Sequence, residues 1–550
     1  MKMGWQGLGA VRALGLVATL SLTSGMALAQ GGPAPAVAQV AASTAVAPRL
    51  SFTADEMALA RAVADEPALA NFYGQNGLKP IFSGPGSEAR RAAVIAAIAT
   101  ARDHGLPPAR YGADALQSAD PSTIAGEVMF ARAFARWADD LSAGILKPAS
   151  VDPGIKREVK HPSVARLMRE FTSSGDPAAV LAAIAPRDPR YIALQRTLAD
   201  RGRLTAPEGT PLAPAGLWRV GARDPRLGDL RLRLSAMGFQ TAPTSDTSLY
   251  DDGLSDAVMR FQKAAGLPSD GVAGPRTIER LNGGADQSTR MIMVAMERMR
   301  WMAVHDLNAR HVWVNIPEFN ARIMDGGTEV FITRTVVGKT DPTMRTPEFS
   351  DEMEHVVVNP RWNVPRSITV KEYLPRLKAN RNAVAHLDVV DSRGNVIPRG
   401  NINFAQYSEA SFPYRMRQKP SSDNALGLVK FIFPNPWNIY LHDTPTKHLF
   451  GERTRSFSHG CVRVGDPFDL ATALLSQQSS DPRGVFERAL ASGRETFLEL
   501  TPHLPVHLVY FTAFPDESGE IRFYGDVYGR DARVWDALAK AGLESDAKSD

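Results

Sequence analysis

The spacing of apolar residues changes along this chain of 550 residues, and this change restricts its possible folds more than any other feature. Up to about residue 285, apolar side chains recur at every third or fourth position, which is typical of amphipathic helices. From about residue 310 they alternate with polar side chains, which is typical of strands with one buried face. A chain of this length usually divides into several domains. The pattern therefore predicts a multidomain α+β protein.

The region 51–210 predicts a helical domain that follows an Ala- and Pro-rich flexible linker at 30–50. Two Ala-rich segments, 88–105 and 127–141, carry apolar residues at helical spacing and end close to a glycine. The region contains no grouping of catalytic side chains.

The first 29 residues predict a secretory signal peptide. Lys2 and Arg12 precede a short apolar run at 13–22, and an A-x-A cleavage pattern follows at 27–29. The apolar run is about half as long as a membrane span requires. We expect export from the cytoplasm with no transmembrane segment after cleavage, and an uncleaved anchor is the alternative.

Residues 220–285 predict a compact unit of three short helices. Gly238 closes the first helix, Gly266 ends the second, and Pro275 stands in the first turn of the third. The second helix places three apolar side chains on one face: Val258, Phe261 and Ala265. This arrangement resembles the peptidoglycan-binding repeats of bacterial wall enzymes, and a plain three-helix spacer is the alternative.

Residues 290–535 predict a strand-rich domain. The Asp-Gly-Gly sequence at 325–327 separates two alternating segments and predicts a β-hairpin, and a turn at 517–519 predicts another. Within this domain the segment 366–423 is rich in loops, and we expect an insertion that covers the sheet. The remaining residues, 536–550, predict a tail.

Composition limits the chemistry of the protein. The net charge is only +4, and no basic arm of the kind that nucleic-acid-binding proteins carry is present, so we do not expect a nucleic-acid partner. One cysteine excludes an intramolecular disulfide and any zinc site with two thiolates. We expect neither a cofactor nor a metal.

The only cysteine, Cys461, lies in the densest group of reactive side chains in the chain. A thiol needs an imidazole or a positive field to become a competent nucleophile, and His442 and His459 are both candidates. His459 is two residues away and is placed to line the pocket, whereas His442 lies 19 positions earlier in an apparent strand that could pair alongside. We assign His442 as the base. Gly460 permits a tight turn, which lets the N–H groups of Gly460 and Cys461 point at an oxyanion.

Two alternatives for the cysteine need no thiol catalysis. A lone cysteine can be a small buried apolar side chain. A zinc site could use His442, His448, His459 and Cys461, but their spacing matches no common zinc arrangement.

The segment HDTPTKHLFGERTRSFSHGCVRV at 442–464 resembles the signature of L,D-transpeptidases with a YkuD-type catalytic domain. Further similarity to the large periplasmic subgroup of that family lies at 346–349, 356–368, 424–435 and 508–514. This subgroup also carries a scaffold, a peptidoglycan-binding unit and a capping insertion, so the resemblance covers roughly residues 50–535. One position departs from it, since Ser421 follows Pro420 where the subgroup commonly has glycine.

The resemblance implies a peptidoglycan enzyme that forms 3-3 crosslinks between diaminopimelate residues of two tetrapeptide stems, donor and acceptor. Cys461 would form a thioester with release of D-Ala, and His442 would act as base and then acid. The backbone carbonyl of Asp443 would orient the imidazole, and the Tyr440 hydroxyl would join the oxyanion donors. Other wall-synthesis enzymes are further expected partners, and carbapenems are expected to acylate the thiol.

Five residues are expected to contact substrate: His459, Ser458, Arg463, Trp362 and Trp437. Arg463 could hold a carboxylate bidentately. His459 and Ser458 would line the pocket, and the two tryptophans would form substrate walls or belong to the core. Three rival functions remain open, namely an L,D-carboxypeptidase that uses water, a transferase that attaches an outer-membrane protein to the wall, and a non-enzymatic wall-binding scaffold.

Overall fold

The strand-rich part of the chain is built on one nine-stranded sheet, with the order β10-β3-β11-β9-β8-β4-β12-β1-β2. The strands are β1 (His311–Asn315), β2 (Asn320–Asp325), β3 (Thr328–Gly338), β4 (Phe349–Val358), β8 (Val429–Ile432), β9 (Leu441–His442), β10 (Ser456–Ser458), β11 (Val462–Val464) and β12 (Thr496–Val509). Because β2 also pairs with β3, the sheet closes on itself. The predicted α+β class is confirmed.

The structure is a computed structural model that describes residues 51–202, 206–207, 209–282 and 287–543. The expected signal peptide and the linker at 30–50 lie outside the described residues. The described residues from Thr53 to Leu543 fall within one unit of the chain. No described helix is long and apolar enough to cross a membrane.

Both predicted hairpins are present. Strands β2 and β3 pair in antiparallel fashion across the turn at 326–327, and β13 (Ala513–Pro515) pairs with β14 (Ile521–Phe523). The alternating segment before residue 325 is not one strand. A short 3₁₀ turn, η3 (Ile316–Glu318), and Phe319 at a positive φ of 60° split it into β1 and β2, which pair with each other.

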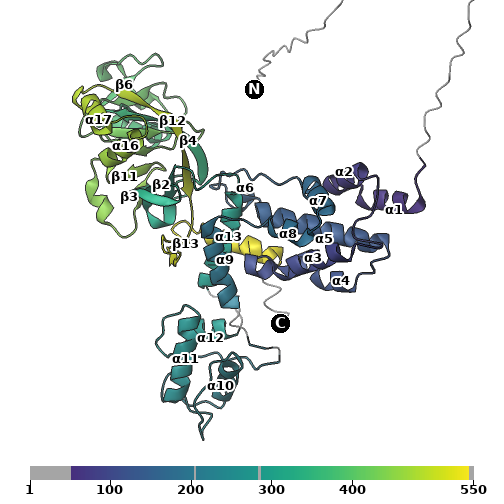
Figure 1. Cartoon of the computed structure of the whole chain (residues 1–550). Coiled ribbons are helices and arrows are strands. Elements are labelled where there is room, and N and C mark those ends of the chain that lie inside the picture. Colours follow the sequence, from purple (N-terminus) through teal and green to yellow (C-terminus); the bar gives the residue numbers. More distant parts are fainter. Residues whose placement is uncertain (1–50, 203–205, 208, 283–286, 544–550) are drawn as a thin grey trace, which may run out of the picture. The chain divides into compact units, whose positions relative to one another are not determined.

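The main core of this part lies between the closed sheet and two helices, α16 (Pro467–Leu475) and α17 (Pro482–Ala491) (Figure 1). The inward-facing side chains are almost all Val, Leu, Ile and Phe, and burial of such side chains stabilises the sheet at roughly 1.5–3 kcal/mol each.

The predicted insertion is more ordered than a loop-rich segment. Residues 362–423, here called the cap, contain a small sheet with the order β5-β7-β6. Its elements are β5 (Trp362–Asn363), α14 (Arg366–Ile368), a π-helical turn η4 (Thr369–Tyr373), α15 (Leu374–Ala379), β6 (Leu387–Val390), η5 (Arg399–Asn401), η6 (Phe404–Gln406) and β7 (Arg415–Gln418). The cap has its own apolar core, against which Tyr440 also packs.

The N-terminal region is helical, as predicted. Its helices are α1 (Ala54–Val63), α2 (Pro67–Gln75), α3 (Glu88–Ala99), η1 (Ala101–His104), η2 (Pro108–Tyr111), α4 (Ala113–Ser118), α5 (Ile124–Ala143), α6 (Pro148–Val151), α7 (Val164–Ser173), α8 (Pro177–Ala182) and α9 (Pro189–Gly202). The Ala-rich segments form α3 and α5, and α5 supplies the buried Phe130, Phe134 and Trp137 to the core of this region. Helix α13 (Gln287–Trp301) shares a separate core with α9.

The three-helix unit consists of α10 (Leu227–Ala236), α11 (Asp252–Ala264) and α12 (Pro275–Leu281), which Figure 1 shows gathered together. Val258, Phe261 and Ala265 are fully buried in its core, as their spacing predicts. The predicted tail differs from the structure, because α18 (Arg530–Leu538) and the helical turn η8 (Ala539–Leu543) continue past residue 536.

Candidate active site

Strand alternation places the reactive side chains together on one face of the sheet. In β8, β9 and β11 the residues Val429, Phe431, Leu441, Val462 and Val464 point into the main core. Alternate side chains point the other way, toward the cap. These are Lys430, Tyr440, His442, Cys461 and Arg463.

Strand register sets the order of these side chains. His442 lies opposite Lys430 of β8 on one side and opposite Arg463 of β11 on the other. The Val462 N–H donates to the Tyr440 carbonyl over 3.1 Å, which places Cys461 beside Tyr440. The predicted strand pairing that brings His442 alongside the cysteine segment is therefore present.

The His442 imidazole is fixed in one tautomer by the backbone. Its Nδ1 lies 2.5 Å from the Asp443 carbonyl oxygen, and because a carbonyl only accepts, Nδ1 carries the proton. The lone pair of Nε2 is left to accept a proton. The expected hydrogen bond from the His442 imidazole to the Asp443 carbonyl is thus present.

The side chain of Asp443 has a separate role in holding the loop. Its carboxylate accepts from Lys447 Nζ and the Thr444 N–H, both over 2.7 Å, and from the Leu428 N–H over 2.9 Å. A Cβ at Gly427, whose φ is +61°, would lie only 2.2 Å from Asp443 Oδ2, so this turn requires glycine.

Burial favours the neutral form of both members of the Cys–His pair. Burial, reinforced by the positive Arg463, lowers the pKa of His442 to about 3. Burial also raises the pKa of the Cys461 thiol, although hydrogen bonds from the Tyr440 N–H and phenol and the charges of Lys430 and Arg463 oppose that shift. Desolvation therefore works against a resting ion pair of thiolate and imidazolium at this site.

We expect the alkylation rate of Cys461 to rise with pH by about tenfold per unit between about pH 6 and 9, because only the thiolate reacts and its pKa is raised. Iodoacetamide modification followed by mass spectrometry measures this rate. A plateau from about pH 4 to 8 would instead show a stable thiolate–imidazolium pair and contradict the neutral resting state.

Lys430 is a site residue that sequence reasoning missed. Its Nζ lies 3.8 Å from the centre of the Tyr440 ring, and its charge favours the Cys461 thiolate. Burial lowers its pKa. The sequence held one signal for this role, a lysine between the two core residues Val429 and Phe431. Alternation along the strand places such a lysine on the opposite side from the core, and this is the side of the sheet on which His442 lies.

The turn before the cysteine is held by one buried hydroxyl. Ser458 Oγ accepts from the Gly460 N–H over 3.1 Å and donates to the Cys461 carbonyl over 2.5 Å. Two expectations are thereby corrected, since the Gly460 N–H is already engaged and Ser458 is 2% exposed and does not line a pocket. Gly460 itself has a φ of +116°, so the turn needs glycine. The Cys461 N–H remains as a donor that no described residue uses.

Arg463 has unused hydrogen-bonding capacity near the thiol. One guanidinium nitrogen donates to Thr446 Oγ1 over 3.1 Å, while the buried Nε has no partner in the described part of the chain. Its charge favours the thiolate, and burial lowers its pKa. The role of Arg463 as a carboxylate ligand stays a prediction.

The remaining expected contact residues lie in different surroundings. Trp362 is 8% exposed and belongs to the cap core, so it is a core residue, whereas Trp437 is 37% exposed and its ring lies 4.7 Å from that of Phe349. His459 projects to the cap, where its Nε2 lies 2.8 Å from a carboxylate oxygen of Glu372. His459 therefore joins the turn to the cap.

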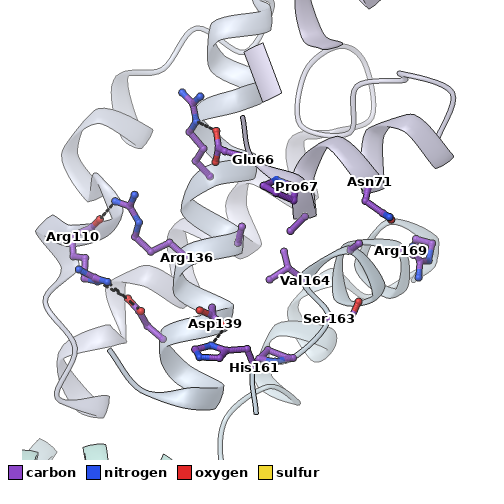
Figure 2. A pocket seen from close by; sticks show the side chains of 16 residues that line it. Glu66, Pro67, Asn71, Arg110, Arg136, Asp139, His161, Ser163, Val164 and Arg169 are labelled. Atoms are coloured by element: carbon purple, nitrogen blue, oxygen red, sulfur yellow. Dashed lines mark hydrogen bonds and ion pairs between the residues drawn. The ribbon is translucent and has the colours of Figure 1, made fainter. Parts of the chain in front are cut away.

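A hollow of about 730 Å³ lies elsewhere, among helices of the N-terminal region (Figure 2). Its lining contains three ion pairs: Arg110–Asp140, Arg132–Glu66 and His161–Asp139. Arg136, also in the lining, donates to the Arg110 carbonyl. The hollow contains none of the predicted site residues.

Among the described residues, no group of three or more His, Cys, Asp or Glu could hold a metal ion.

Comparison with known proteins identifies three regions of the chain. The L,D-transpeptidase catalytic domain (YkuD) matches residues 309–483, the scaffold domain matches 67–198, and the domain described as "Putative peptidoglycan binding domain" matches 223–281.

One curated relative, a "Putative L,D-transpeptidase" of Haemophilus influenzae, is 34% identical over 256 residues, which is 45% of this chain and 51% of the relative. The chain thus matches about half the length of that relative.

Two solved L,D-transpeptidase structures are similar to the chain. The one from Xylanimonas cellulosilytica is 15% identical and covers 54% of this chain and 100% of its own, with a TM-score of 0.15. The one from Stackebrandtia nassauensis is 14% identical and covers 55% and 97%, also with a TM-score of 0.15, and neither adds to the argument at that score. The match to the L,D-transpeptidase catalytic domain (YkuD) instead includes the strands that carry His442 and Cys461, and the chain also matches a scaffold domain and a putative peptidoglycan-binding domain.

Proposed function

We propose that the protein is a cysteine-dependent L,D-transpeptidase that forms 3-3 crosslinks in peptidoglycan. The observation that carries this proposal is the placement of Cys461 and His442 on one face of paired strands, with the imidazole Nδ1 bound to the Asp443 carbonyl. This leaves Nε2 as a base on the face that also bears the thiol. The matches to the L,D-transpeptidase catalytic domain and to the putative peptidoglycan-binding domain support peptidoglycan as the substrate.

In the first half-reaction the Cys461 sulfur attacks the amide carbonyl between diaminopimelate and the terminal D-Ala of the donor stem. His442 Nε2 takes the thiol proton as the C–S bond forms, because a neutral thiol must lose its proton during attack. The negative oxygen is stabilised by the Cys461 N–H and the Tyr440 hydroxyl. The C–N bond then breaks, D-Ala leaves with the proton from His442, and a thioester remains.

In the second half-reaction the amine of an acceptor stem attacks the thioester. His442 accepts a proton from that amine, the new amide forms, and the departing sulfur recovers the proton. The positive charges of Lys430 and Arg463 favour the sulfur anion as it leaves. No metal or cofactor takes part in this sequence.

The setting of the enzyme follows from its domains and its N-terminus. We infer that the protein acts in the periplasm, where stem peptides are present, and that the peptidoglycan-binding domain holds it at the wall. The A-x-A pattern at 27–29 supports export.

The test of this proposal is product analysis. Purified protein is incubated with disaccharide tetrapeptide, and the products are identified by mass. Crosslinked dimer together with free D-Ala is the expected result. Tripeptide without dimer would indicate an L,D-carboxypeptidase, absence of any turnover would leave a wall-binding role, and attachment of a protein would appear as protein bound covalently to sacculi.

We expect Glu372→Gln in the cap to shift products from dimer toward tripeptide by about two- to fivefold. The Glu372–His459 hydrogen bond joins the cap to the turn that carries Cys461, and a partly exposed contact of this kind contributes about 1 kcal/mol. A cap held less firmly admits water to the thioester. The ratio of dimer to tripeptide measures the effect.

Lys378→Gln provides the matched control, because Lys378 is an exposed charged residue of α15 in the same cap. It should leave the ratio unchanged. Equal ratios for Glu372→Gln and wild type would show that this contact does not govern the choice of acceptor.

A further inference from the structure

Thr346, which lies just before β4, is bound through all of its polar groups. It is fully buried, and its N–H donates to the Tyr528 hydroxyl over 3.3 Å. Its carbonyl accepts from Arg530 over 3.1 Å. Its hydroxyl oxygen accepts from the Gly338 N–H over 2.9 Å and lies 2.7 Å from the Gly460 carbonyl oxygen.

The direction of the last hydrogen bond is determined by chemistry. The Gly460 carbonyl can only accept, so the single hydroxyl proton of Thr346 points at it. The Tyr528 hydroxyl donates in turn to the Gly338 carbonyl over 2.6 Å, which ties the same segment to the end of β3. The chain also packs closely around Gly338, since a Cβ at this position would lie 2.1 Å from the Met344 carbonyl oxygen.

A trans peptide is planar, and its C=O and N–H point in opposite directions. Holding the Gly460 carbonyl therefore also sets the direction of the Cys461 N–H. The other two backbone groups of the turn, the Gly460 N–H and the Cys461 carbonyl, are held by Ser458 Oγ. Thr346 supplies the remaining restraint, on the one peptide plane whose N–H is still available.

We propose that Thr346 is a positioning residue that orients the Gly460–Cys461 peptide so that the Cys461 N–H serves as the oxyanion donor. This inference rests on the proposed acyl-transfer function. Thr346 touches no reacting atom, and it acts through the Gly460 carbonyl. Its effect is therefore confined to reactions that develop negative charge on oxygen.

The test compares two reactions of the same thiol in the full-length protein. Release of D-Ala from a tetrapeptide passes through an oxyanion, whereas alkylation by iodoacetamide does not. For Thr346→Val we expect kcat for D-Ala release to fall about tenfold to a hundredfold. This is less than the loss of about 10²- to 10³-fold for removal of an oxyanion donor, because the Cys461 N–H is misdirected and not removed. The alkylation rate at the same pH should stay within about twofold of wild type, and Thr346→Ser, which keeps both hydrogen bonds, should restore most of kcat.

Thr335→Val is the matched control. Thr335 is a fully buried threonine of β3 whose hydroxyl has no partner within the described chain, so this change removes a hydroxyl without removing a hydrogen bond. It should leave both rates unchanged. If circular dichroism shows that Thr346→Val is unfolded, Tyr528→Phe is tested instead, because this change removes the acceptor of the Thr346 N–H. We expect the same result, a lower rate of D-Ala release with an unchanged rate of alkylation.

The inference is overturned if D-Ala release is unchanged in folded Thr346→Val, or if release and alkylation fall together, since the second result indicates a purely structural role. Failure of the proposed function looks different. Wild-type protein would then release no D-Ala, and no comparison between variants would be involved.

Discussion

Cys461→Ala is expected to abolish D-Ala release and dimer formation, with a loss of at least about 10⁴-fold, while the protein stays folded and still binds sacculi. Cys461 is the only cysteine of the chain, so no other thiol can form the proposed thioester. Sacculus binding persists because the peptidoglycan-binding match at 223–281 lies outside the catalytic domain. The measurements are product analysis by mass and co-sedimentation with purified sacculi.

Cys461→Ser tests loss of the thiol nucleophile while the volume of the side chain is nearly preserved. A serine fits the same space, but its hydroxyl loses a proton far less readily than a thiol, so we expect no turnover at neutral pH. Dimer formation by either variant would refute the thioester mechanism. Loss of sacculus binding together with activity would show that the substitution disturbs more than the site.

His442→Asn is expected to lower kcat by about 10²- to 10⁴-fold, the range that general acid–base catalysis contributes. An asparagine side chain can still donate to the Asp443 carbonyl in place of Nδ1–H, but it offers no basic nitrogen where Nε2 stands. The loss should therefore appear mainly in kcat and not in KM, and steady-state kinetics of D-Ala release measure both.

His448→Gln serves as the control for this variant. His448 is an exposed histidine of η7 (Lys447–Gly451), only six positions from His442, and it lies outside the proposed machinery. Its substitution should leave kcat unchanged. A loss of activity in His448→Gln comparable to that in His442→Asn would favour a shared metal site over a Cys–His pair.

The alternation of side chains and the residue types predicted much of this site. Cys461 and His442 stood out because a lone cysteine beside His-Gly and an upstream His-Asp pattern carry the chemistry of acyl transfer. The hairpin at 325–327 and the burial of Val258, Phe261 and Ala265, in α11 and at its C-terminal end, were also predictable, because turn chemistry and helical spacing are local properties.

What the tertiary structure decided depends on contacts between distant segments. The pKa values of Cys461 and His442 depend on burial of their side chains. They also depend on the charges of Lys430 and Arg463, which belong to two different strands, β8 and β11. The Gly460 N–H, which the sequence analysis assigned to the oxyanion, donates instead to the Ser458 hydroxyl. Thr346 lies 114 positions before Gly460 and carries no motif of its own. Local spacing determines which face of a strand a side chain occupies, but desolvation and hydrogen-bond competition depend on everything packed around it, and those neighbours are known only once the chain has folded.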